Sequence, residues 1–417
     1  MNKAVVIGGG IAGLAAARVL ADHFSSVVVC DKDPHIGSAQ VRVGAPQGSH
    51  LHVLLKNGQS VLQELMPEVF DKVSTSQCPT IDWAQDTVWE NKFGRFPRYA
   101  SDEKTFAFSR GLLESEVFKS VSQYKNISFK YGQVLEFKTF ESQIKNITLI
   151  SGEIIEADLF VFAGGAQAKL PALLGLLQSQ IPYDVTDIDV TYYSARFKTE
   201  TVSLPDCAQY YYQADPHLES IGGVISPIEN GLTVATLIEY GKTPVRLLDR
   251  AAFLAKSMQL PKLDFFSAVM KAEMQGQVSC FHKKTMSRVR PSAFKHLPSN
   301  LILVGDALLS LNPVFGQGMT SAFLQIRELN TQLKKNKNIN AIQFHKKALS
   351  LTNTAFAMSK AGSMDQRHYV KRYLDGYLQL AGKSQAHHLR FLQALHLERG
   401  PLSLFDAGVA IKAMRPQ

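Results

Sequence analysis

The sequence has few cysteines and no long apolar run, and each absence excludes a class of protein. Its 417 residues include only four cysteines, none in C-x-x-C spacing: Cys30, Cys78, Cys207 and Cys280. Disulfide scaffolds and cysteine-ligated metal sites are therefore not expected, whereas a reducing compartment is. No uninterrupted apolar run reaches the roughly 20 residues that span a bilayer. We predict a soluble, cytoplasmic protein without a metal site.

Charge of one sign is not concentrated in any segment either. Lys and Arg total 45 against 36 for Asp and Glu, which gives a net charge of +9. No Lys/Arg block is dense enough to indicate a nucleic-acid partner. The mild positive bias suits an anionic cofactor or an acidic membrane surface. Hydrophobic residues make up 45% of the chain, enough for a sizeable core, which excludes a disordered or fibrous protein.

The N-terminus carries the clearest local pattern. Residues 4–7 are a short β-branched run, and residues 11–23 are rich in Ala and Leu. Between and within them Gly8, Gly10 and Gly13 fit the pattern G-x-G-x-x-G. The first glycine allows a tight turn, the second lets the backbone approach a pyrophosphate, and the third lets the helix pack closely on the strand. The helix N-terminus then offers free N–H groups to phosphates.

A second buried strand over residues 27–29 ends at Asp31, 18 residues after Gly13. An acid at this place accepts hydrogen bonds from a ribose hydroxyl. Glycine turns alone occur as structural turns, but strand, helix, second strand and terminal acid together predict dinucleotide binding. The pattern does not separate FAD from NAD.

A second polar site follows the short strand over residues 301–304. Asp306 comes directly after that strand, and a Pro-containing loop then leads into a Gly-x-Gly that opens a helix. Such a site can bind a polyol chain through the carboxylate and a developing anion at the helix start. The alternative is a capped helix with a lead-in loop. The candidate residues after Asp306 are Pro313, Gly316, Gln317, Gly318 and Met319.

The remaining periodicity divides the chain into α/β, β-rich and helical parts. One helix is expected over residues 59–70 and another after Arg110, with Tyr/Val/Thr-rich antiparallel strands between about 185 and 240. The expected fold class is α/β: a Rossmann-type dinucleotide-binding domain with an inserted antiparallel β-sheet substrate domain and a helical C-terminal region. The predicted boundaries are 1–75, 100–180 and 281–340 for the first, 76–99 and 181–280 for the second, and 341–417 for the third.

The motifs around Asp306 resemble the second FAD motif of flavin-dependent aromatic hydroxylases and epoxidases with the para-hydroxybenzoate hydroxylase fold. The segment from Arg42 through Gln47 to His52 resembles a bacterial subgroup that includes polyether-type epoxidases. The resemblance implies that the Rossmann-type domain is a glutathione-reductase-like FAD-binding domain. It implies that Asp306 contacts the ribityl chain and that the following loop covers the pyrimidine side of the flavin. It also implies that Arg110 reaches the adenosine or pyrophosphate. The cofactor set it implies is completed by Lys32, Arg42, Gln47 and Val134.

One departure from that family concerns the electron donor. Many hydroxylases of this fold carry an Asp-Gly pair after a central strand, whereas residues 159–165 end in Ala163-Gly164-Gly165. In that family the pair is associated with both FAD and pyridine-nucleotide handling. NADPH or NADH is therefore expected either to dock directly or to act through a separate flavin reductase.

The catalytic candidates are His50 and Arg196. His50 either orients the substrate or shuttles protons near the flavin, or it is a hydrogen-bonded loop residue. Arg196 is either a cation at the pocket mouth or a strand-end salt-bridge partner. Because alternate strand residues face opposite sides, at most half of the tyrosines at positions 192, 193 and 210–212 can line one cavity.

The leading functional hypothesis is an FAD-dependent monooxygenase that acts through a flavin C4a-hydroperoxide. It would insert one oxygen atom from O2 into a small, hydrophobic aromatic or unsaturated substrate by hydroxylation or epoxidation. The alternatives are a flavin-dependent reductase of prenyl chains and a non-redox cyclase or lipid-chaperoning protein of the same fold. A halogenase is disfavoured because no Trp-x-Trp-x-Ile-Pro segment occurs.

The C-terminal tail from Leu402 to Met414 combines apolar residues with Lys412. Amphipathic spacing of this kind is typical of a helix that packs on the body of the protein, here on the flavin domain. The alternative is peripheral contact with a membrane that holds a hydrophobic substrate.

Overall fold

The computed structural model describes residues 2–34, 46–166, 170–176, 178–204, 206–241, 244, 249–336 and 338–414. A five-stranded parallel sheet has the order β17 (Leu301–Leu303), β11 (Leu159–Phe162), β1 (Lys3–Ile7), β2 (Ser26–Asp31), β7 (Ile127–Tyr131). Its strands are short, apolar and almost wholly buried, as expected for a parallel sheet covered on both faces. The predicted strand–turn–helix–strand unit is confirmed.

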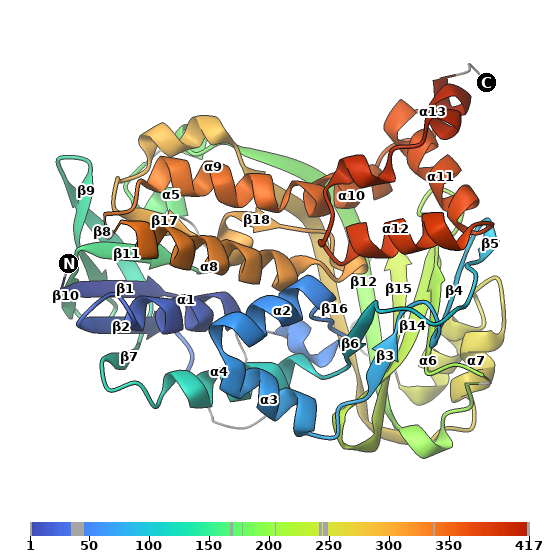
Figure 1. The fold of residues 1–417 in the computed structure, drawn as a ribbon. Helices are drawn as coiled ribbons and strands as arrows, with labels where there is room; N and C mark the ends of the chain where they lie inside the picture. The colour runs from blue at the N-terminus through green and yellow to red at the C-terminus, as the bar shows by residue number, and fades with distance from the viewer. Residues whose placement is uncertain are drawn as a thin grey trace.

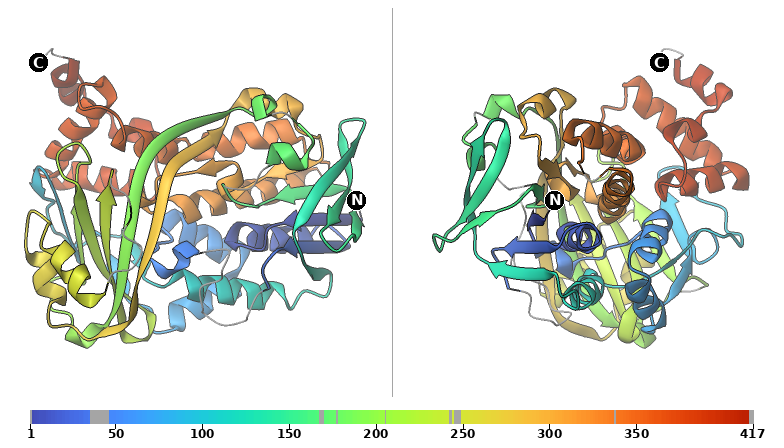
Figure 2. Two further views of the ribbon diagram at one scale, coloured as in Figure 1. Left: turned by 180° about the vertical axis from the view of Figure 1, so that it is seen from behind. Right: turned by 60° about the vertical axis from the view of Figure 1, so that its left-hand side comes forward.

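Two different layers cover this sheet (Figure 1, Figure 2). One is helical and contains α1 (Ile11–Ala21), α4 (Arg110–Val121) and α8 (Gly318–Lys335), with α1 in contact with both of the others. The other is a three-stranded antiparallel sheet of β10 (Ile154–Glu156), β9 (Gln143–Leu149) and β8 (Val134–Phe140). The rings of Phe137 on β8 and Phe162 on β11 pack edge to face with their centroids 6.0 Å apart. This sheet therefore packs directly on the parallel one.

An eight-stranded sheet forms the second half of the molecule. Its order is β18 (Leu309–Ser310), β16 (Met274–Val289), β12 (Tyr183–Lys198), β15 (Leu232–Tyr240), β14 (Ile221–Ile228), β13 (Gln209–Gln213), β4 (Thr87–Asn91), β5 (Gly94–Arg95). The helices α6 (Arg250–Ser257) and α7 (Asp264–Val269) cover its outer face, where Phe253 packs between Phe197 and Phe265. The predicted antiparallel block is confirmed, including its insertion between parts of the parallel sheet.

The long strands β12 and β16 connect the two halves. Each has 16 residues, and they pair from Tyr183–Val289 to Phe197–Met274. Figure 2 shows them running together along the length of the molecule. The boundary predicted between residues 280 and 281 falls inside β16, because one continuous strand belongs to both halves.

The helix expected over residues 59–70 is in fact two helices, α2 (Lys56–Leu65) and α3 (Pro67–Thr75). Pro67 has no N–H to donate to a preceding turn, so α2 ends before it and α3 begins with it. The other short elements are β3 (Thr80–Asp82), β6 (Lys104–Phe106) and α5 (Leu170–Leu173).

The C-terminal part is helical as predicted, with α9 (Ala341–Leu351), α10 (Asn353–Gly362), α11 (Tyr369–Ala381), α12 (Gln385–Leu395) and α13 (Ala407–Met414). A buried ion-pair network joins α11 to the eight-stranded sheet. Lys371 and Lys92 both contact Asp215 and Asp375 at 2.6–2.9 Å. Burial alone would raise the pKa of Asp215, but the hydrogen bonds from the two lysines lower it to about 2.

The expectation that the tail packs on the flavin domain is wrong, because α13 packs on α11 instead. Val409 and Ala413 are buried there, and a Cβ at Gly376 of α11 would lie 3.0 Å from Val409, so the small residue permits the close contact. The other side of the tail stays exposed. Within the described residues, no helix is long and apolar enough to traverse a bilayer.

Candidate functional site

One cavity of about 1240 Å³ extends from the carboxyl edge of the parallel sheet to the inner face of the eight-stranded sheet. This volume exceeds the roughly 300–1,000 Å³ of an ordinary small-ligand pocket, so it can hold a dinucleotide and a second small molecule. Most of the predicted site residues line it: Gly8, Gly10, Asp31, Lys32, Gln47, His50, Arg110, Val134, Asp306, Pro313, Gly316, Gly318 and Met319.

The first glycine turn lies at one end of the cavity. Gly8 has φ +103°, and a Cβ there would lie 2.4 Å from the Ala163 carbonyl oxygen, so only glycine fits. Gly13 does not line the cavity. A Cβ on Gly13 would lie 1.8 Å from the Gly8 carbonyl oxygen, so Gly13 serves the close packing of helix on strand, as predicted. Gly10 is the N-cap of α1 and lines the cavity at the helix N-terminus.

Asp31 ends β2 at the same edge, as predicted. Its carboxylate accepts hydrogen bonds from the backbone N–H groups of Gly9 and Asp33, the latter at 2.8 Å. Asp31 also lines the cavity, where its carboxylate can accept a hydrogen bond from a ribose hydroxyl. The carboxylate therefore both holds the glycine turn and faces the cavity.

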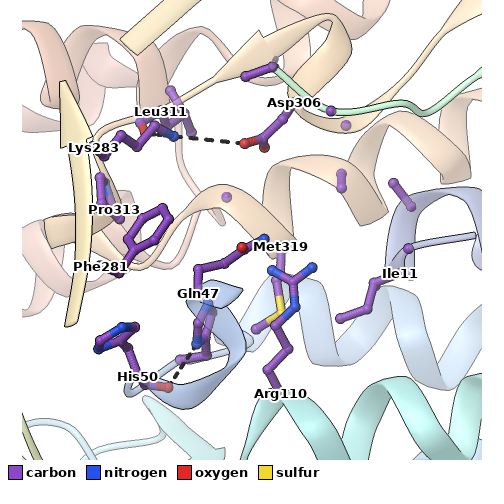
Figure 3. Close-up of a pocket in the computed structure, with 18 of the residues that line it drawn as sticks. Ile11, Gln47, His50, Arg110, Phe281, Lys283, Asp306, Leu311, Pro313 and Met319 are labelled. Carbon is purple, nitrogen blue, oxygen red and sulfur yellow. Dashed lines mark hydrogen bonds and ion pairs between the residues drawn. The ribbon is translucent and has the colours of Figure 1, made fainter. Parts of the chain in front are cut away.

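Arg110 enters the cavity from the first turn of α4. The N-cap residue Ser109 accepts a hydrogen bond from the Leu112 N–H at 3.1 Å and donates its own N–H to Glu229 at 2.7 Å. Glu229 belongs to the turn between β14 and β15, so the inserted sheet fixes the start of α4. Figure 3 shows Arg110 and Gln47 entering from one side of the site and Asp306 and Lys283 from the other.

Lys283 is a site residue that the sequence reading missed. Its Nζ donates to Ser310 Oγ at 2.8 Å and to the Leu311 carbonyl at 2.9 Å, and it lies 3.8 Å from Asp306 Oδ2. Ser310 also donates to Asp306, at 3.2 Å. A lone lysine in a strand carries no local signal, because only the pairing of β16 with β18 brings it to the loop.

The loop before α8 depends on a second glycine. Gly316 has φ +65°, and a Cβ there would lie 2.4 Å from Val53 Cγ1. A side chain would therefore be strained and would also collide with Val53. The turn directs the N-terminus of α8 at the cavity, which Gly318 and Met319 line.

Two of the predicted residues, Gln317 and Arg196, have a different position. Gln317 is fully buried away from the cavity, and its amide donates to the Leu395 carbonyl at 3.0 Å, so it ties α8 to α12. Arg196 is not among the described residues that line the cavity, although its charge reaches His50. The sequence places Arg196 on a strand but does not indicate how far along that strand the cavity extends. Arg42 lies outside the described residues.

His50 lines the cavity and is 5% exposed. Its Nδ1 is 2.8 Å from Ser194 Oγ, which is 2.6 Å from Thr236 Oγ1. Burial, reinforced by His52 and Arg196, lowers the pKa of His50 to about 3. His50 is therefore a neutral imidazole at physiological pH. It is anchored through β12, an arrangement the sequence did not indicate.

The prediction that at most half of the five tyrosines line one cavity is confirmed. Tyr192 and Tyr211 line the cavity, whereas Tyr193, Tyr210 and Tyr212 are not among its lining residues. The register pairs Tyr192 with Phe281 and Ile238, so one row across three strands presents apolar side chains to the same space. The inner sheet face is thus an apolar wall.

These residues fit FAD. The N-terminus of α1 and the glycine turn suit a pyrophosphate, Asp31 suits the adenosine ribose, and Asp306 with the start of α8 suits the ribityl chain and flavin. No group of three or more metal-ligating side chains occurs among the described residues.

The comparisons with known proteins agree with this geometry. Residues 3–110 match the family described as FAD dependent oxidoreductase. The structure of the flavin-dependent brominase Bmp2 superposes with a TM-score of 0.71 at 14% identity, over 94% of this chain and 93% of that one, which shows the fold. The first 110 residues therefore resemble FAD-dependent oxidoreductases, and the chain has the fold of flavin-dependent enzymes such as this brominase.

Two relatives match most of the chain. It is 28% identical over 406 residues to Protein Rv3254 of Mycobacterium tuberculosis, covering 91% of this chain and 84% of that protein. It is 20% identical over 369 residues to the mitochondrial ubiquinone biosynthesis monooxygenase COQ6 of Caenorhabditis elegans, covering 79% of this chain and 78% of that protein.

Replacing Asp306 with Ala should weaken FAD binding by about 1.5–3 kcal/mol, because the ribityl hydroxyls lose a charged acceptor. This corresponds to a roughly ten- to hundredfold higher Kd, measured by titrating apoprotein and following flavin fluorescence. Asp31→Ala should act in the same direction at the ribose. Asp365→Ala, at an exposed position, serves as the control. An unchanged Kd in both site variants would refute the assignment of the two carboxylates.

Proposed function

We propose that the protein is a monooxygenase that inserts one atom of O2 into a small, apolar aromatic or unsaturated substrate. The observation that carries this proposal is the single cavity, which joins the FAD-binding edge to an apolar sheet wall. The second oxygen atom leaves as water. NADPH or NADH supplies two electrons and one proton as hydride, directly or through a separate reductase, and the second proton comes from solvent. The similarity to a relative named as a monooxygenase supports the proposal.

The chain's own residues would position the substrate, shield it from water and stabilise negative charge on the flavin. FAD, when bound, supplies the activation of oxygen. The N-terminus of α8, an 18-residue helix, favours negative charge beside the flavin. The side chains of Tyr192, Tyr211 and Phe281 line the same cavity as Pro313 and would shield a bound substrate from water. Tyr211 donates to the Val314 carbonyl at 3.5 Å, which links the wall to that loop.

A single-turnover experiment tests this proposal without knowledge of the natural donor. The holoenzyme is reduced with dithionite under nitrogen and mixed with 2-naphthol and oxygen-18 gas, and the product is analysed by mass spectrometry. We expect one oxygen-18 atom in the product and one equivalent of product at most per flavin. Product that contains no oxygen-18, or that forms equally with oxidised flavin, would favour the reductase or the non-redox alternative.

We further propose that the C-terminal tail contacts an anionic lipid surface. Leu402 is 86% exposed, Phe405 63% and Ile411 55%, and Lys412 beside them is exposed as well. Figures 1 and 2 show this region projecting from the body. Exposed apolar side chains with an adjacent cation are the features of interfacial membrane binding.

Sedimentation with phosphatidylglycerol vesicles tests the tail. We expect binding that falls as salt rises, because screening weakens the attraction. The double variant Phe405→Glu/Ile411→Glu should lose it. Phe140→Glu, which changes an exposed phenylalanine (61%) on β8, should retain it and is the control. Equal sedimentation of all three proteins, or dissociation of a dimer by the double variant, would contradict membrane contact.

A further inference from the structure

The cavity divides into a charged part and an uncharged part. Its charged lining residues lie at the carboxyl edge of the parallel sheet, on α4, and on β16 with the loop that Lys283 holds. By contrast, strands β12, β15, β14, β13 and β4, all fully described, contribute no charged side chain to the lining. A carboxylate or ammonium group of a substrate would find no counter-ion on that wall, and unpaired charges are costly to bury.

Most polar groups on this wall and beside it already have hydrogen-bond partners within the protein. Trp89 Nε1 donates to Gln213 at 3.1 Å, Trp83 Nε1 donates to Thr105 at 2.8 Å, and the Tyr211 hydroxyl donates to Val314. These bonds orient the aromatic rings and engage the N–H and O–H donors, so these donors are not available to a ligand.

Two polar atoms are exceptions. His50 Nε2 and the Tyr192 hydroxyl are buried and have no hydrogen-bond partner among the described residues. Both side chains are more than nine-tenths buried, both line the cavity, and their ring centroids are 5.9 Å apart. Buried polar groups in folded proteins are nearly always hydrogen-bonded. Because both residues line the cavity, a polar group of a bound ligand can supply the missing partner.

The chemistry of the two atoms defines that group. The phenol of Tyr192 is neutral, because burial raises its pKa well above the usual value, and its hydroxyl is a donor. His50 is also neutral. Either hydroxyl of the Ser194–Thr236 pair can be the donor, so His50 Nδ1–H can donate to Ser194, which leaves Nε2 an acceptor. A ligand hydroxyl satisfies both, because it accepts from Tyr192 and donates to His50.

We propose that His50 and Tyr192 are the specificity-determining pair for an uncharged hydroxyl group on an otherwise apolar, flat substrate. The inference rests on the proposed use of this half of the cavity as the substrate site. It predicts discrimination in binding, which is measurable on the oxidised holoenzyme without turnover.

The test uses three probes that differ in one group: naphthalene, 2-naphthol and 2-naphthoate, each titrated against the flavin absorbance spectrum. In the parent protein, 2-naphthol should bind about tenfold more tightly than naphthalene, as expected for two hydrogen bonds in a buried site. 2-Naphthoate should bind no better than naphthalene. Tightest binding of the naphthoate would overturn the inference.

Single variants test the contributions of the Tyr192 hydroxyl and of His50 Nε2 separately. Tyr192→Phe removes only the hydroxyl, and His50→Asn keeps an amide near Ser194 while removing the Nε2 position. Each should lower the preference for 2-naphthol over naphthalene by about three- to tenfold, measured as the ratio of the two affinities on flavin-loaded protein. Tyr211→Phe is the matched control, because its hydroxyl already has a partner, and should keep the preference. His50→Gln, which places an amide near the Nε2 position, should restore part of it.

Two outcomes separate this inference from the proposed function. A protein that shows the predicted binding preferences but incorporates no oxygen-18 refutes the monooxygenase proposal alone. A protein that incorporates oxygen-18 but keeps the same preference in Tyr192→Phe and His50→Asn refutes the specificity pair alone.

Discussion

The close approach of α1 to β1 is the constraint on which the site depends. Gly13 lies so near the Gly8 carbonyl that no side chain fits between them. Any larger residue would push the helix off the sheet and move its N-terminus away from the sheet edge. The carboxylate of Asp31 binds the Gly9 N–H of the same turn, so the second strand reinforces the geometry set by the first. Turn, helix start and acid are therefore one rigid unit.

A second constraint is the alternation of side chains between the two faces of the eight-stranded sheet. Because successive side chains alternate between faces, the register that places Tyr192 on the inner face also places Tyr193 on the outer one. The inner row meets the cavity, and the outer row packs under α6 and α7. The long strands β12 and β16 then carry this wall to the flavin half, where Lys283 fixes the loop that contains Leu311. Cofactor edge and apolar wall are thus held in a fixed relation by two strands.

The sequence was sufficient where structure is local. The glycine turn, Asp31, Asp306 and the start of α8 each depend on a strand and the few residues that follow it. The sequence was insufficient where a side chain's position depends on contacts with segments distant in the chain. Gln317 lies between two lining glycines, yet its side chain turns to the Leu395 carbonyl of α12. No pattern in the sequence indicates such a partner 78 residues away. The same limitation applies to Lys283 and to the anchoring of His50 by Ser194.

The central claim is that the cavity binds FAD along its whole charged edge, from the end of β2 to the start of α8. Titrating apoprotein with FAD and with FMN, followed by flavin fluorescence, tests it most directly, because FMN lacks the adenosine half. The account predicts that FAD binds at least about a hundredfold more tightly, as the loss of several charge-assisted hydrogen bonds would cause. Equal affinity for the two flavins would contradict it.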